Sequence, residues 1–62
     1  MTEEQIKSFK DLYRKVSYAD YTCNSAGKQK TVIYLNGLQA MMLFCAVKDF
    51  AKVHNVDLRY NK

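Results

Sequence analysis

The sequence predicts one small α+β domain spanning residues 1–62, with the element order α-β-β-α-β. Two segments place apolar residues at helical spacing, and each follows a polar residue suited to cap a helix. Residues 18–35 and 56–60 instead alternate and are rich in β-branched and aromatic residues. We therefore expect a three-stranded, mainly antiparallel sheet with both helices on one face.

The first helix is predicted to begin at residue 3 and to end near Ser17. Thr2 and Gln5 fit a capping box, in which the threonine hydroxyl accepts from the third helical amide and the glutamine reaches back. The apolar positions that follow recur every three or four residues and form one stripe. The stripe consists of Ile6, Phe9, Tyr13 and Val16, with Leu12 beside it.

Two strands are predicted near residues 18–23 and 29–35, joined by a turn over Asn24–Lys28. The last strand covers residues 56–60. We prefer the strand order 2-1-3 to 1-2-3, since it makes every pairing antiparallel. The side chains expected to face the helices are Tyr21, Ile33, Leu35, Val56 and Leu58.

The second helix, residues 37–54, carries two apolar stripes where a small soluble domain needs one. Asn36 is the expected N-cap with Gln39 as its reciprocal partner, and Asn55 is expected to close the helix. One stripe, the expected core, is formed by Ala40, Leu43, Val47, Phe50 and His54. The other lies roughly opposite and is formed by Leu38, Met41, Cys45, Lys48 and Lys52.

The second stripe is apolar in its first half and basic in its second. Either the first helix covers it or another molecule does. In the latter case we expect a protein-binding site, with Met42 adding flexible apolar surface. Its residues would be Leu38, Met41, Met42, Cys45, Lys48 and Lys52. The partner would be a protein, acidic if the lysines guide it, or a second copy in a homodimer.

A nucleic-acid interface is the alternative. The formal net charge is +4 and the pI is near 9.2, which favours acidic partners in general. The outer face of the predicted sheet would combine tyrosines for base stacking with cations for phosphates. Its residues would be Tyr18, Lys30, Tyr34 and Arg59.

Enzymatic function is not expected, and neither is a cofactor, a metal or a small-molecule substrate. The one histidine, His54, lies on the expected core stripe, and the cysteines Cys23 and Cys45 have no metal-site spacing. No glycine-rich phosphate loop is present. The polar, acidic N-terminus and the absence of a long apolar run predict a cytoplasmic protein without a membrane span. The expected function is that of a small inhibitor or modulator of another protein, of the kind that phages and mobile elements encode.

Overall fold

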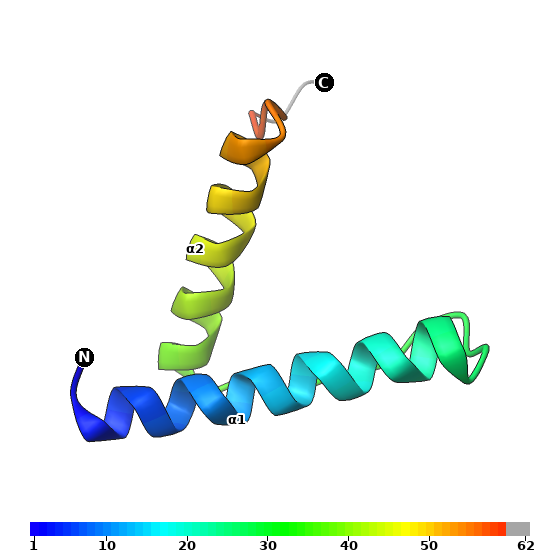
Figure 1. The fold of residues 1–62 in the computed structure, drawn as a ribbon, viewed down its shortest axis with the longest axis horizontal. Helices are drawn as coiled ribbons and strands as arrows, with labels where there is room; N and C mark the ends of the chain where they lie inside the picture. Colours follow the sequence, from blue (N-terminus) through cyan, green and yellow to red (C-terminus); the bar gives the residue numbers. More distant parts are fainter. Residues whose placement is uncertain (60–62) are drawn as a thin grey trace.

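Two helices that meet at one point make up the fold. The computed structural model describes residues 1–59 and contains α1 (Glu3–Asp20), a π-helical turn η1 (Tyr21–Ser25) that continues it, and α2 (Gly37–Val53). Within residues 1–59 there is no strand. Figure 1 shows α2 rising from the N-terminal half of α1 and leaving an open angle above the C-terminal half.

The start of α1 confirms the predicted capping box. The Thr2 hydroxyl accepts from the Gln5 amide at 3.1 Å, and the Gln5 side chain accepts from the Thr2 amide at 2.8 Å. The predicted end near Ser17 is wrong, because the helix runs through Asp20 and then through η1. Residues 18–23, predicted as a strand, are therefore helical. The tyrosine, threonine and cysteine residues in this segment do not prevent a helix, because each disfavours it by only about 0.5 kcal/mol relative to alanine.

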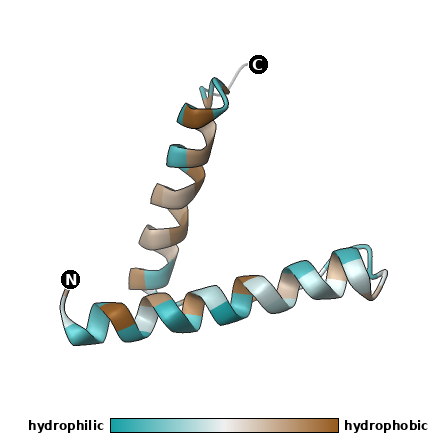
Figure 2. Cartoon of the chain, in the orientation of Figure 1, coloured by the Kyte–Doolittle hydropathy of each residue, from teal (hydrophilic) through white to brown (hydrophobic). Residues whose placement is uncertain are grey.

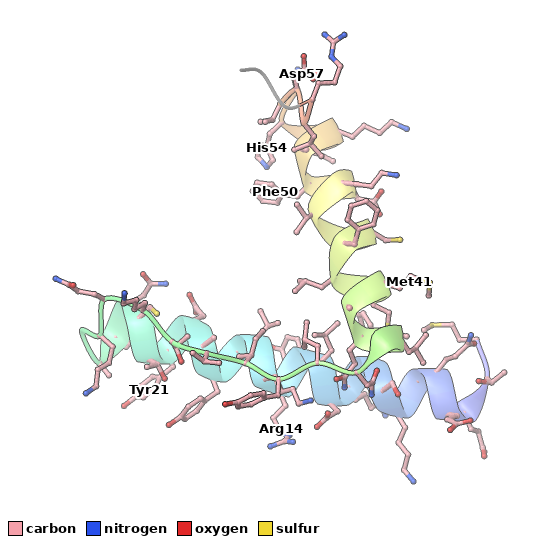
Figure 3. All side chains as sticks on the ribbon, turned by 180° about the vertical axis from the view of Figure 1, so that it is seen from behind. Arg14, Tyr21, Met41, Phe50, His54 and Asp57 are labelled. Carbon is pink, nitrogen blue, oxygen red and sulfur yellow. The ribbon has the colours of Figure 1, made fainter. Side chains whose placement is uncertain are left out.

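The helical segment stops where glycine allows the chain to reverse. Gly27 has a φ of 80°, in the left-handed region that glycine enters without steric cost. Residues 29–35 then run back along α1 (Figure 3) in an irregular conformation rather than as the predicted strand. Their alternation persists, since Ile33 and Leu35 are half-buried whereas Val32 and Tyr34 are exposed.

The two ends of α2 match their predictions. The Asn36 side chain accepts from the Gln39 amide at 2.9 Å, and Asn55 adopts a left-handed φ of 56° just after the helix. The Val56 amide donates to Ala51 O at 2.8 Å and the Asn55 amide to Lys52 O at 3.4 Å, which is a Schellman motif. Of the residues predicted to form the last strand, Val56 belongs to this turn, residues 57–59 are irregular, and residue 60 lies outside the described chain.

The α+β prediction is wrong because none of its three strands exists within residues 1–59. The fold is helical, so neither proposed strand order applies and the predicted tyrosine-bearing sheet face is absent. An alternating sequence forms a strand only when a neighbouring strand completes its hydrogen bonds, and here the alternating segment packs on a helix instead.

Little apolar surface is buried in this arrangement. Leu12, 5% exposed, and Ala51, 3% exposed, are the buried hydrophobic residues of the described chain. Figure 2 shows that α2 is apolar over most of the side in view, whereas α1 alternates between polar and apolar patches. The helices thus offer much more hydrophobic surface than they cover.

Candidate functional site

Gln39 joins the two helices. It is 1% exposed, and its side-chain amide donates to Ser8 O at 3.1 Å and to Asp11 Oδ2 at 2.8 Å, both on α1. Its carbonyl oxygen accepts from the Asn36 amide at 3.2 Å and from Lys15 Nζ at 3.0 Å. One side chain therefore caps α2 and fixes its first turn on α1.

The charged groups around Gln39 support the same junction. Lys15 Nζ lies 3.2 Å from Asp11 Oδ2 and also donates to Tyr34 O at 2.7 Å, which ties the loop to α1. Hydrogen bonds from Arg14, Gln39 and Lys15, in decreasing order of effect, hold the pKa of Asp11 well below its usual range. These three hydrogen bonds keep the Asp11 carboxylate ionised at neutral pH.

The predicted protein-binding residues follow one side of α2 from this junction outward. Leu38 and Met42 are half-buried near the base, while Met41, Cys45, Lys48 and Lys52 are exposed. We call this set of six residues the outer face. Because α1 contacts only the beginning of α2, it does not cover the exposed four. Lys48 Nζ lies 5.2 Å from the centroid of the Phe44 ring, within cation–π range.

The stripe expected to be core is open as well. Val47 is 51% exposed and Phe50 66% exposed, and the Phe50 ring lies 4.3 Å from that of His54. Figure 3 places Phe50 and His54 on the side of α2 that borders the open angle, with Met41 on the opposite side. We call Ala40, Leu43, Val47, Phe50 and His54 the inner face. Its periodicity was visible in the sequence, but periodicity alone does not tell an internal core from an exposed surface.

The residues of the nucleic-acid alternative are only partly gathered. Tyr18 and Tyr34 line one open groove together with Arg14, Lys15, Val32 and Ile33. Lys30 does not line this groove, and Arg59 Nη2 pairs with Asp57 Oδ2 at 2.8 Å beyond the end of α2. The Arg59 pair lowers the pKa of Asp57.

Other chemistry-bearing groups are scattered. Cys23 and Cys45 are free thiols, half-buried and exposed respectively. Within residues 1–59, no three histidine, cysteine or acidic side chains come together in a way that could hold a metal ion. The described helices include none with the length and hydropathy needed to cross a membrane.

Comparison of the chain with known protein families, with curated proteins and with solved structures found no match.

Proposed function

We propose that this chain is a non-enzymatic protein-binding module that inhibits or modulates an acidic partner through the outer face of α2. The observation that carries the proposal is Met41, which is 54% exposed on a helix that meets α1 only near its N-terminal end (Figure 1). An exposed apolar strip bordered by charge is typical of a protein-binding surface.

The chemistry of the partner follows from the charges beside Met41. Lys48 and Lys52 lie one turn apart on the outer face, and Asp49 is the single acidic residue of α2. An acidic partner would be attracted by the two lysines, and its association rate would fall as salt rises. The apolar half of the face would supply the affinity, since burying Met41 contributes about 1.5–3 kcal/mol before the costs of association.

The test has two steps, capture of the partner by photocrosslinking and then binding measurements on charge variants. In cells that express the chain, a photoreactive residue at position 41 should crosslink a protein that the same residue at position 32 does not crosslink. With that protein purified, Met41→Asp should abolish binding and Lys48→Glu/Lys52→Glu should slow association at low salt. Val32→Asp introduces the same charge at another exposed apolar position and should bind as the native chain does.

Circular dichroism on the same variants checks folding, because a charge at an exposed helical position changes stability by less than about 0.5 kcal/mol. If Met41→Asp unfolds the chain, or if the folded variant still binds, the outer face is not the binding surface.

Nucleic-acid binding is the second candidate, and the groove between Tyr18 and Tyr34 favours it. Both tyrosines are largely exposed beside Arg14, so a base could stack while a phosphate meets the guanidinium. Labelled single-stranded DNA and RNA should then bind at low salt and lose affinity as salt rises. Binding that persists after Tyr18→Ala and Tyr34→Ala would contradict this candidate.

A further inference from the structure

The chain exposes far more surface than its mass allows for a compact monomer. Its accessible surface is 5828 Å² at 7.2 kDa, whereas a compact folded monomer of that mass exposes about 4,100 Å². Its radius of gyration is 13.7 Å, against about 10.6 Å for a compact chain of this length. Each chain therefore exposes roughly 1,700 Å² more accessible surface than a compact monomer of the same mass.

The inner face is the part of this excess that carries no formal charge at neutral pH. Its residues Ala40, Leu43, Val47 and Phe50 are apolar, and the lysines and the aspartate of α2 all lie outside this face. Nothing on this face selects an acidic partner, in contrast to the outer face with Lys48 and Lys52. Two copies, each of net charge +4, could meet here without bringing lysines together.

We infer that a second copy of this chain covers the inner face, with α2 packed antiparallel against α2 of its partner about a two-fold axis near Val47. The spacing of the inner face is symmetric about this residue: Ala40 and His54 lie seven positions to either side, and Leu43 and Phe50 lie four and three. An antiparallel pair therefore sets the small Ala40 opposite His54 and Leu43 opposite Phe50, with Val47 meeting its own copy. Such a self-complementary surface is what an isologous contact requires.

The area agrees with an obligate dimer. Two separate copies of 5828 Å² each would have to bury about 4,800 Å² in total to become as compact as a protein of twice the mass. Obligate homodimers bury about 2,000–5,000 Å². The inner faces do not supply this area alone. Because α2 rises from the N-terminal half of α1 (Figure 1), an antiparallel pair would bring α1 of each copy toward the C-terminal end of its partner's α2. The side chains Val53, Val56 and Leu58 at that end are exposed.

This inference is independent of the proposed function, because the inner and outer faces lie on opposite sides of α2 (Figure 3). A dimer formed through the inner face leaves Met41 free for an acidic partner. Failure of one proposal does not entail failure of the other.

Sedimentation equilibrium tests the oligomeric state. The native chain should sediment as a dimer at micromolar concentration, and so should Met41→Asp. Val47→Asp places two carboxylates face to face at the two-fold axis and should abolish the dimer. A native chain that is monomeric at high micromolar concentration, whether extended or compact, would overturn the inference, since a compact monomer would mean that α2 folds back on α1.

Cysteine crosslinking keeps the test informative if Val47→Asp fails to fold. In a Cys23→Ser/Cys45→Ser background, Val47→Cys should form a covalent dimer rapidly under mild oxidation, because its thiol meets its own copy. Met41→Cys, on the opposite side of the helix, is the matched control and should form little. Equal yields for the two variants would overturn the proposed contact.

Discussion

At the scale of single residues, Gln39 is the most constrained side chain of the described chain. It is buried, and both its donor and its acceptor are used: the amide group bonds to α1, and the oxygen bonds to the cap of α2 and to Lys15. A buried amide with partners on all sides tolerates substitution poorly, because each lost bond leaves another group unsatisfied. The sequence predicted the capping role of Gln39 but not its bonds to α1, which depend on where the two helices meet.

Replacing Gln39 by alanine should destabilise the chain by about 1–3 kcal/mol, since the Ser8 carbonyl and the Asn36 amide lose a buried partner. Gln5→Ala is the matched control, because Gln5 makes the same capping box in α1 but its side chain makes no hydrogen bond to α2 within the described residues. Urea unfolding at one protein concentration measures both. Equal losses for the two variants would show that the bonds to α1 contribute nothing.

Asp11 makes the junction sensitive to acid. Its pKa is lowered in the folded chain, chiefly by Arg14, so its contribution to stability is fully present above its unfolded pKa of about 3.9 and is lost as the pH falls below it. Asp11→Asn should therefore be less stable than the native chain at pH 7, and the difference should shrink below about pH 4. Urea midpoints at several pH values measure it, and a difference independent of pH would contradict the assignment.

At the scale of elements, the sequence predicted helix boundaries where side chains bond locally and failed where distant pairing decides. The capping boxes at Thr2 and Asn36 and the end of α2 at Asn55 depend on neighbours three residues away, and all three were predicted correctly. The strands were not, because alternation in residues 29–35 is equally satisfied by packing Ile33 and Leu35 against a helix.

The C-terminal end of α2 gives a prediction of this local kind. Asn55→Gly should leave the melting temperature nearly unchanged, since glycine accepts a φ of 56° without strain. Asn55→Val should destabilise the chain by about 1–2 kcal/mol, the cost of a left-handed conformation for an ordinary residue. Thermal melts followed by circular dichroism compare the two variants. Equal melting temperatures would mean that the turn rearranges.

At the scale of the whole molecule, the sequence predicted where the apolar surfaces of α2 lie but not how much of them stays exposed. The two stripes of α2 were both identified by their spacing. The spacing did not predict which stripe would face α1. In the structure the helices meet at Gln39, and α1 leaves most of α2 uncovered. The inner face, expected to be internal core, is therefore as open as the outer face at Val47 and Met41.

The stability of the chain should depend on its concentration. If folding and dimerisation are coupled, the melting temperature rises with protein concentration, because the folded state contains two chains and the unfolded state one. Calorimetry or circular dichroism over a hundredfold range of concentration measures this. Met41→Asp should show the same concentration dependence as the native chain. A constant melting temperature would mean that α2 is stable without a second copy.

The connection between the helices has a consequence for limited proteolysis. Residues 29–35 make no backbone-to-backbone hydrogen bond within the described chain, and the lysines at 28 and 30 are exposed there. A protease accommodates such a segment far more readily than a helix, so trypsin should cut first after one of these lysines. The cut would break the covalent connection between α1 and α2, and the two fragments of one copy would then be held by the hydrogen bonds of Gln39 to α1 and by the bond from Lys15 Nζ to Tyr34 O. Where these bonds and the two-fold arrangement together hold the fragments, a chain cut within residues 28–35 still sediments as one particle.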